Sequence, residues 1–359
     1  MRILYLLTSL GVGGAEKQVI DLAQRMAARG HTVAIMSLKH VEEEWPVKLP
    51  VVRLNLLKTP MGIWRGLRFA KSFLSIFRAD LIHSHTFPAN MFARMLRADG
   101  FSGPVINTIH NVYEGGWHRT LLYRATEPLV RTVSAVSAAA AQRSVRVGAV
   151  SARKMSVLSN GIDTTHFTSD KKRRRTLRSL MQTGSDFVWI AVGRLAPAKD
   201  YPNLLRAFAL VREIHPDAQL WIVGEGENSI IDTSASGVRW LGLRRDVVDL
   251  LDASDGFVMS SEWEGMPLAI GEAMAMEKTV VATDVGGIRE LVGEAGLIVP
   301  PRDSAALADA MLKVMTMDEW QRGVMRRDAR EQIVRQYSMD ARAMDWEEMY
   351  ARLLPPGQA

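Results

Sequence analysis

Two glutamates stand eight residues apart in the stretch 262–275, EWEGMPLAIGEAMA. Pro267 suits the first turn of a helix, where its missing N–H costs nothing. Such a helix directs free backbone N–H groups and the positive end of its dipole toward the preceding loop, which suits a diphosphate. Glu264 precedes that end and Glu272 lies one to two turns behind it. The pattern predicts phosphate at the helix tip, a sugar beside Glu264 and a ribose beside Glu272. The alternative for either glutamate alone is that acidic residues favour the first turns of helices.

A second candidate site for phosphate is the stretch 192–200, VGRLAPAKD. Gly193 allows close approach of the backbone. Arg194 and Lys199 stand five residues apart across a turn that contains proline, so both can reach one phosphate group. The alternative is a surface loop with ordinary basic residues. Weaker signals of the same kind are the glycine-rich strand ends IVGEGE (222–227) and ATDVGGIRE (282–290).

The first half of the chain carries a glycine loop and three histidines. Gly13 and Gly14 follow an apolar run, but their surroundings match neither G-x-G-x-x-G nor Walker A, which weakens the dehydrogenase and P-loop NTPase interpretations. His110 ends one expected strand, and His83 and His85 end another, at the edge where ligands bind in open sheets. No carboxylate cluster accompanies them, and the chain has no Asp-x-Asp. We expect neither a metal nor a cofactor.

Composition indicates a soluble globular protein of two domains. The chain has 359 residues, 47% hydrophobic and 23% charged. It has no cysteine, which excludes disulfides and thiolate metal sites. The apolar run at the amino terminus is shorter than a membrane span and is followed by glycines, so we interpret it as a buried strand. A cytoplasmic location is the expectation.

Short apolar runs alternate with helical patterns along the chain, which predicts doubly wound parallel sheets. The expected strands are 2–9, 31–38, 51–55, 81–85, 105–110, 132–137, 155–162, 187–193, 219–224, 238–243, 256–261, 279–284 and 296–300. The series breaks at the basic stretch 168–180. We therefore predict two Rossmann-like domains facing a central cleft, at 1–165 and 185–335, with a basic linker at 166–184 and a carboxyl-terminal helix, about 336–359, that returns to the first domain.

Charge is divided unevenly between the two halves. Residues 1–165 hold 21 Lys and Arg against 10 Asp and Glu, whereas the remainder holds 24 against 29. The alternatives are chance or an anionic partner, such as a membrane surface, a lipid phosphate or nucleic acid. The helical stretch 62–78 places Arg65, Arg68 and Lys71 beside an apolar stripe, which fits either a membrane-docking helix or an ordinary helix packed on the sheet.

The same two alternatives apply to the stretch 115–131. The run KKRRR at 171–175 fits a solvated linker better than a binding patch. We expect no nucleic acid as a partner, because no recognised motif is present and acidic residues stand at the predicted cleft.

These residues together resemble the retaining glycosyltransferase family 4, which has the GT-B fold, over nearly the whole chain. The matching segments follow the family's order: GGAE, TIH, SNGID (159–163), VGRLAPAKD, IVGEGE, LGLRRDV, SEWEGMPLAIGEAMA and ATDVGGIRELV. The E-x7-E pair with its surroundings is the specific element, whereas GGAE alone would not be. One departure is Asp200, where many members have glycine, and it puts the flexibility of that loop in question.

The resemblance implies a nucleotide-sugar donor on the second domain. Arg194 and Lys199 look like the pair that holds the diphosphate, Glu264 like the contact to the donor sugar, and Glu272 like the ligand of the ribose hydroxyls. His110 resembles the first-domain histidine near the anomeric centre. The remaining implied contacts to the donor are Gly13 and Gly14 near the phosphate and acceptor, Gly193, Arg244 near the base, and Gly265, Met266, Pro267 and Leu268 through their backbone N–H groups.

The function predicted on this basis is a metal-independent, retaining transfer of a hexosyl or N-acetylhexosaminyl group from a UDP- or GDP-sugar. The acceptor would be a saccharide, such as a lipid-linked glycan or a lipopolysaccharide or exopolysaccharide precursor at the cytoplasmic face of the membrane. Two other classes stay open: a nucleotide-sugar 2-epimerase, which also uses tandem Rossmann domains, and a non-catalytic nucleotide-sugar-binding protein. The sugar, the base, the linkage and the oligomeric state cannot be predicted from this sequence.

Overall fold

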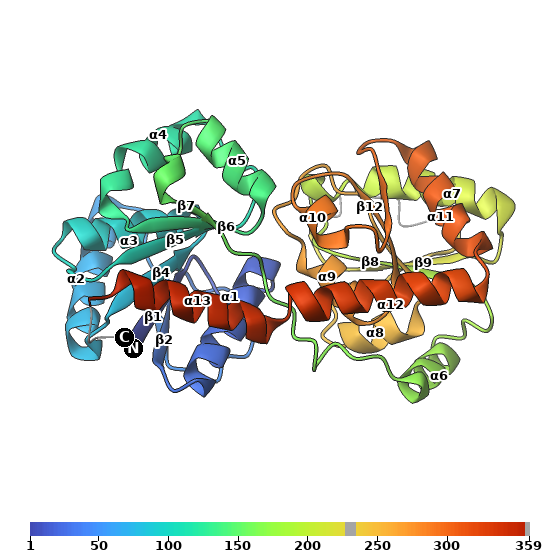
Figure 1. Cartoon of the computed structure of the whole chain (residues 1–359), viewed down its shortest axis with the longest axis horizontal. Helices are drawn as coiled ribbons and strands as arrows, with labels where there is room; N and C mark the ends of the chain where they lie inside the picture. Colours follow the sequence, from blue (N-terminus) through green and yellow to red (C-terminus); the bar gives the residue numbers. More distant parts are fainter. Residues whose placement is uncertain (227–234, 356–359) are drawn as a thin grey trace. The chain divides into compact units, whose positions relative to one another are not determined.

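The structure is a computed structural model that describes residues 1–226 and 235–355 of the chain. The chain divides into two compact units (Figure 1). Unit 1 comprises Met1–Gly161 and Met339–Ala359, and unit 2 comprises Ile162–Ser338. Each unit is built on one parallel sheet with helices packed on both of its faces.

Unit 1 holds a sheet of seven strands in the order β3-β2-β1-β4-β5-β6-β7. Its strands are β1 (Arg2–Leu7), β2 (Thr32–Ser37), β3 (Val51–Arg53), β4 (Leu81–His85), β5 (Val105–Ile109), β6 (Thr132–Ala135) and β7 (Met155–Val157). Its α-helices are α1 (Gly14–Ala28), α2 (Pro60–Phe77), α3 (Phe87–Ala98), α4 (Trp117–Ala125), α5 (Ala138–Arg146) and α13 (Met339–Leu353), and two 3-10 turns lie at Glu127–Leu129 and Ala152–Lys154.

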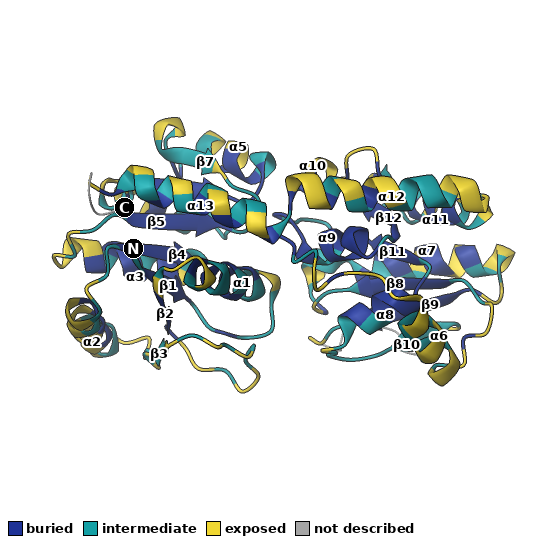
Figure 2. Cartoon of the chain, turned by 60° about the horizontal axis from the view of Figure 1, so that its bottom comes forward, coloured by how far each residue is buried: buried dark blue, intermediate teal, exposed yellow. Residues whose placement is uncertain are grey.

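Alternation along β1 divides the core of unit 1 into two layers. Ile3 and Tyr5 face the layer that contains α1 and α13, whereas Leu4 and Leu6 face the layer that contains α2, α3 and α5. All four side chains are fully buried because the strand is covered on both faces. Figure 2 shows the central strands β1, β4 and β5 as buried and the outward face of α2 as exposed.

Unit 2 holds a sheet of six strands in the order β10-β9-β8-β11-β12-β13. Its strands are β8 (Val188–Val192), β9 (Gln219–Val223), β10 (Val238–Trp240), β11 (Gly256–Met259), β12 (Thr279–Thr283) and β13 (Leu297–Val299). Its α-helices are α6 (Lys171–Leu180), α7 (Tyr201–Ile214), α8 (Val247–Ala253), α9 (Leu268–Ala275), α10 (Ile288–Val292), α11 (Ser304–Thr316) and α12 (Glu319–Gln336), with one 3-10 turn at Pro197–Lys199.

The strand pattern predicted from sequence is confirmed in both units, since each of the expected stretches contains one strand and paired strands run parallel. The prediction works because strands covered on both faces are apolar along most of their length, and such runs lack the spacing of apolar and polar residues that is typical of a surface helix. Glu227, the last residue of the stretch 222–227, and residues 356–359 lie outside the described residues.

Two local predictions differ from the structure. The stretch 166–184 is not only a linker: it belongs to unit 2 and forms α6, in which Arg173 bonds Asp252 and Arg174 bonds Asp255. These ion pairs hold the basic run against α8 and the start of β11, so it is not simply solvated. Pro267 was placed in the first turn of its helix, but it stands at the N-cap position and the helix begins at Leu268.

Candidate functional site

The strand orders of both sheets fix where a ligand can bind. In unit 2 the order reverses between the neighbouring strands β8 and β11, and in unit 1 it reverses between β1 and β4. Ligands of open α/β sheets bind at such switch points, outside the carboxyl ends of the strands. In unit 2 these ends lead into the loops 193–200 and 260–267, which carry most of the site residues predicted from sequence.

The two loops of unit 2 meet through one ion pair. Lys199 Nζ lies 2.5 Å from Glu264 Oε1, and the hydroxyl of Ser261 donates to the same carboxylate oxygen at 2.9 Å. The side chains keep only 19% and 12% of their surface exposed, so the pair is shielded but still reachable. The structure therefore brings together Lys199 and Glu264, two residues that are far apart in the sequence.

Backbone contacts hold these loops in place. The hydroxyl of Ser260 donates to the carbonyl oxygen of Lys199 at 2.8 Å. The N–H of Glu262 donates to the carbonyl oxygen of Ala198, also at 2.8 Å. On the other side, the Tyr201 hydroxyl donates to the carbonyl of Gly193 at 2.8 Å. Burial, together with the nearby charge of Glu264, raises the pKa of Tyr201. Tyr201 was not singled out from the sequence, where it reads as an ordinary core residue at a helix start.

Asp200 has an unusual backbone conformation at the end of the lysine loop. Its φ is 44° and its ψ 50°, in the left-handed region that glycine adopts without strain. Its carboxylate accepts the N–H of Asn203 at 3.3 Å and so caps α7. Burial raises the pKa of this carboxyl. The departure from glycine noted in the sequence is therefore accommodated, because aspartate tolerates this conformation and adds a cap.

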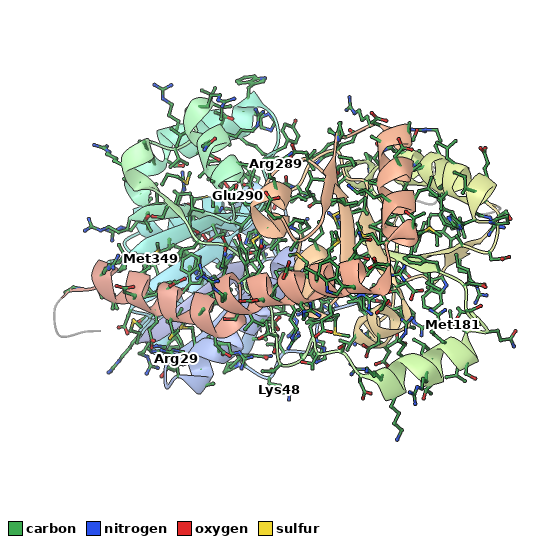
Figure 3. All side chains as sticks on the ribbon, turned by 45° about the vertical axis from the view of Figure 1, so that its right-hand side comes forward. Arg29, Lys48, Met181, Arg289, Glu290 and Met349 are labelled. Atoms are coloured by element: carbon green, nitrogen blue, oxygen red, sulfur yellow. The ribbon has the colours of Figure 1, made fainter. Side chains whose placement is uncertain are left out.

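A glycine turn supports Glu264 from behind. Gly286 has a φ of 57°, and a Cβ at this position would lie 2.0 Å from the carbonyl oxygen of Glu264. The N–H of Gly287 donates to the carbonyl of Gly265 at 2.7 Å. The stretch 282–290, a weak signal in the sequence, thus holds the loop that carries Glu264. Figure 3 shows Arg289 and Glu290 on α10, which follows this turn, and Arg289 pairs with Asp284.

Helix α9 places the second glutamate in the interior. Glu272 is the fifth residue of the helix and keeps 8% of its surface exposed. Gly271 beside it allows close packing, since a Cβ there would lie 2.7 Å from Ile162 Cδ1. Met266 and Leu268 are buried, so only their backbone groups remain available to a ligand at the helix start. A buried carboxylate one turn inside α9 is consistent with binding a ligand that reaches past the helix tip.

The other two predicted cations of unit 2 are in different situations. Arg194 is exposed and makes no hydrogen bond or ion pair with the described part of the chain. Arg244 forms a two-pronged pair with Asp246, at 2.8 Å from Nε and 2.6 Å from Nη2. This hydrogen bonding raises the pKa of Arg244 and lowers that of Asp246. Arg194 is therefore available for a phosphate, whereas Arg244 would first have to share or leave its carboxylate.

In unit 1 the switch point is lined by buried histidines and by the glycine loop, beside which the Glu16 carboxylate lies. Gly13 caps α1 and Gly14 is its first residue, so the glycine loop presents the amino end of a fifteen-residue helix. His85 Nδ1 lies 3.0 Å from His110 Nε2, which joins the ends of β4 and β5. Burial lowers the pKa of His110 to about 4, and burial together with the other histidines lowers that of His85 well below its usual range. Both imidazoles are therefore uncharged at neutral pH.

The third histidine is tied to α13. His83 Nδ1 lies 2.7 Å from the Tyr350 hydroxyl, and its Nε2 lies 2.7 Å from the Thr108 hydroxyl. The Tyr5 hydroxyl lies 3.1 Å from that of Tyr350. Both nitrogens of His83 are thus occupied, which makes it a structural residue. Among residues 1–226 and 235–355, no group of three or more His, Asp or Glu side chains is placed to hold a metal ion.

A buried acid next to His110 was missed in the sequence. The Glu114 carboxylate accepts the Tyr123 hydroxyl at 2.7 Å, and Tyr123 in turn receives Asn90 Nδ2 at 3.0 Å. Burial raises the pKa of Glu114. No motif marks this residue, because its role depends on α4 and α3 being folded against each other. The one sequence signal that could have found Glu114 is an isolated acidic residue shortly after a histidine at the end of an expected strand.

One sizeable cavity of unit 2 lies away from all of these groups. It measures about 470 Å³ and lies at the amino ends of β8, β11 and β12, the edge of unit 2 opposite to the predicted site. Lys278, whose pKa burial lowers to about 8, lines it together with charges of both signs. Among helices within the described ranges, none has both the length and the apolar composition needed to cross a bilayer.

Comparison with known proteins connects both units to one class of enzyme. The model described as Glycosyltransferase Family 4 matches residues 12–166, and the model described as Glycosyl transferases group 1 matches residues 186–317. Two glycosyltransferase models thus match successive parts of the chain, and curated proteins similar to it include named galactosyl- and mannosyltransferases.

Two relatives and one solved structure illustrate the likeness. A UDP-Gal:alpha-D-GlcNAc-diphosphoundecaprenol alpha-1,3-galactosyltransferase of Escherichia coli is 26% identical over 306 residues, 78% of this chain and 79% of the relative. The phosphatidyl-myo-inositol mannosyltransferase of Mycobacterium leprae is 26% identical over 338 residues, 85% of this chain and 84% of the relative. Anabaena Alr3699/HepE, solved in complex with UDP, superposes with a TM-score of 0.83 at 21% identity and covers 98% of this chain and 100% of its own. The fold is GT-B, as predicted.

Proposed function

We propose that this chain, whose two domains match glycosyltransferase models, is a retaining enzyme of the E-x7-E type that transfers a hexosyl or N-acetylhexosaminyl group from a UDP- or GDP-sugar. The observation that carries the proposal is the contact of Lys199 with Glu264 at the switch point of unit 2. A cation suited to a diphosphate and a carboxylate suited to sugar hydroxyls meet at one point, directly in front of α9. The donor named for the E. coli relative and the UDP complex of the Anabaena protein support a nucleotide-sugar ligand.

The proposed roles follow from the environment of each residue. Lys199 and Arg194 would stabilise the charge that develops on the leaving diphosphate, together with the backbone N–H groups at the start of α9. Glu264 would accept hydroxyls of the donor sugar, and Glu272 would accept those of the ribose. His110, which is neutral at physiological pH, would donate or accept one hydrogen bond near the anomeric centre without repelling an oxocarbenium-like carbon.

Metal-independent transfer and retention of configuration are parts of the same proposal. Two cations and a helix end supply the positive field that a diphosphate requires, so the chemistry does not need a bound metal. The described site contains no side chain placed as a dedicated nucleophile, and attack by the acceptor on the face that the diphosphate leaves would retain configuration. Because Glu264 already neutralises Lys199, donor binding would require the carboxylate to exchange its cation for sugar hydroxyls.

The deciding experiment is a thermal-shift screen with UDP, GDP, ADP and their common sugar conjugates, with and without magnesium. A ligand that binds only the folded state raises the melting temperature. We expect one nucleotide class to raise it without magnesium, and Glu272→Ala to abolish the shift. Glu262→Ala is the matched control, since Glu262 stands two residues from Glu264 but pairs with the exposed Arg302. No shift with any nucleotide, or an equal loss in both variants, would contradict the proposed donor site.

The screen is followed by an assay that separates transfer from the alternatives. Turnover of the identified donor only when a saccharide acceptor is added indicates a transferase. Conversion of the donor to its C2 epimer without acceptor would instead indicate an epimerase. Tight binding with neither reaction would indicate a non-catalytic binding protein.

The acceptor is proposed to be a lipid-linked glycan or a polysaccharide precursor at a membrane surface, on which unit 1 would rest through α2. Ala70 and Leu74 face the core, whereas Trp64 is 55% exposed and Ile76 79% exposed. Arg68 lies over the Trp64 ring, with Cζ 5.8 Å from its centroid. A helix that exposes both aromatic and basic side chains suits the interface of an anionic bilayer. The name of the E. coli relative, which includes a diphosphoundecaprenol-linked acceptor, supports this class.

Sedimentation with vesicles of increasing phosphatidylglycerol content tests this surface. We expect binding that falls with salt and is lost on changing Arg65, Arg68 and Lys71 to glutamine. The matched control removes the same number of charges from unit 2, by changing Lys171, Lys172 and Arg175 on α6 to glutamine. Equal loss in both triple variants, or binding that salt does not weaken, would rule out docking through α2.

A further inference from the structure

A small cavity of about 50 Å³ lies in unit 1 where β5 ends, between α4 and α5. Ile109, the last residue of β5, forms part of its wall, and the next residue in the chain is His110. Val112, Val147 and Ala149 add to its apolar wall, and most of the other lining side chains are polar or charged. The cavity is large enough for a few water molecules or one group of the size of phosphate, but not for a sugar ring.

Two arginines and one acid are the charged groups that line this cavity. Arg119 donates from Nη1 to the carbonyl of Glu114 at 2.6 Å, and its Cζ lies 4.7 Å from the centroid of the Phe87 ring. A backbone bond and a ring thus hold this guanidinium in a fixed position and leave its other N–H groups for a ligand. Arg143, on α5, is exposed, and its side chain has no hydrogen bond or ion pair with the described residues.

The acid offsets the charge of only one of these cations, and only in part: Glu114 attracts Arg119 electrostatically, but no ion pair joins it to either arginine in the described part of the chain. The Glu114 carboxylate accepts the Tyr123 hydroxyl, and it also accepts the backbone N–H of His110. Its hydrogen-bonding capacity is therefore largely used inside the protein. The cavity thus has two guanidinium groups and one carboxylate that interacts with Arg119 alone, so its excess charge is positive and favours an anion.

We propose that this cavity binds the phosphate group of the acceptor substrate. Guanidinium groups bind phosphate oxygens in pairs, and two of them can hold one phosphate from two sides. The helix α4 that supplies Arg119 also exposes Trp117 and Leu121, so a lipid attached to that phosphate would find apolar side chains beside it. The identification of the ligand as the acceptor rests on the proposed function, whereas the anion site itself rests only on the geometry of unit 1.

The test separates this site from the donor site in unit 2. Inorganic phosphate is titrated, with ³¹P NMR as the readout, into the full chain carrying Arg194→Ala and Lys199→Ala, which removes the proposed cations of the donor site. We expect phosphate still to bind, and an added Arg143→Ala to weaken it about tenfold or more, as loss of one charge-assisted pair does. Arg146→Ala is the control, since it removes the same charge from the same helix one turn away.

A second variant guards against a folding defect. Arg119→Lys keeps the charge but not the planar fork, so it is expected to weaken phosphate severalfold while the melting temperature stays near that of the parent. Absence of phosphate binding in the parent, or equal effects of Arg143→Ala and Arg146→Ala, would overturn the proposal. If the wild-type chain binds no nucleotide but its phosphate binding still depends on Arg143, the anion site stands and the proposed function fails.

Discussion

The carboxyl edges of the two sheets share a topology but differ in electrostatics. In unit 2 this edge carries two ion pairs: Lys199 pairs with Glu264, and Arg244 pairs with Asp246. In unit 1 the corresponding edge carries His85 and His110, whose charge is suppressed by burial. The difference shows that the loops and their burial decide the chemistry of a site, while the fold decides only where it lies.

Net charge of a domain conceals this difference. The first half of the sequence is strongly basic, yet the histidines at its switch point are neutral, and its exposed cations lie on outer helices such as α2. The second half is acidic overall, yet its switch point presents Lys199 and Arg194. A ligand with a diphosphate is therefore best matched by unit 2, although unit 1 has the larger positive charge.

The largest effect is expected from the core of unit 1, which depends on α13. Trp346 is 3% exposed and packs against His83 with ring centroids 4.4 Å apart. Trp346→Ala should lower the free energy of unfolding by about 3–5 kcal/mol, because it leaves a large cavity under the sheet. The control is Trp320, which is 75% exposed on α12 of unit 2. Trp320→Ala should change the free energy of unfolding by less than about 0.5 kcal/mol. Urea unfolding measures both.

Equal destabilisation by the two tryptophan variants would contradict the assignment of α13 to the core of unit 1. It would also leave unexplained the bond between His83 and Tyr350, which joins the last helix to the middle of the sheet.

The second effect concerns the charged edge of unit 2. Lys199→Ala should lower kcat by about 10²–10³-fold, the usual loss when one preorganised donor to a developing anion is removed. Arg302→Ala provides the control, since Arg302 pairs with Glu262 nearby but is 73% exposed. Initial-rate kinetics with the donor found in the screen give the comparison. Full turnover of Lys199→Ala would show that the charged edge is structural.

The third effect is a different pH dependence of the two units. His110 has a folded pKa of about 4 against 6.5 when unperturbed, so the unfolded chain binds more protons between these values. Its contribution to stability is therefore complete above pH 6.5 and is lost as the pH falls toward 4, by at most about 1.4 kcal/mol per pH unit. The raised pKa of Glu114 acts in the opposite direction, so the quantity to measure is the difference between wild type and His110→Gln.

Lys278 of unit 2 should also make the stability of the protein rise with pH, but over a higher pH range. Its folded pKa is about 8 against 10.5, so the unfolded chain binds more protons between these values and stability rises with pH. Lys278→Met should remove this rise between pH 8 and 10, as measured by urea unfolding. A rise that survives the substitution would mean that other groups control stability there.

Much of the fold could be predicted from the sequence because burial on both faces leaves an unmistakable pattern. The runs at 2–9 and 187–193 became central strands since their residues are apolar on both faces. The stretch 166–184 was misjudged as a linker, because its arginines look solvent-exposed until Asp252 and Asp255 are folded against them. Contacts between distant residues are not encoded in local composition.

The candidate site divides in the same way. Lys199 and Glu264 could be proposed from the sequence because each lies in a recognisable motif, and the structure adds that they form an ion pair. Glu114 and Arg143 were not found, because neither belongs to a motif and their meaning depends on how α4 and α5 enclose a cavity. Motifs can point to candidate residues within one loop, whereas a cavity lined by separate helices can be recognised only in the folded chain.

The smallest effect is expected at Asp200, where the loop of Lys199 turns into α7. Glycine adopts a φ of 44° without strain, but it lacks the carboxylate that accepts the N–H of Asn203. These two effects oppose each other, so Asp200→Gly should change the free energy of unfolding by less than about 1 kcal/mol. Turnover should stay nearly intact. Asp200→Val should be clearly worse, because a β-branched residue is strained in this conformation. Parallel unfolding and rate measurements on the two variants check this order. Equal stability of the Asp200→Gly and Asp200→Val variants would mean that the loop changes conformation at little cost. The conformation of Asp200 could then not be what holds Lys199 against Glu264.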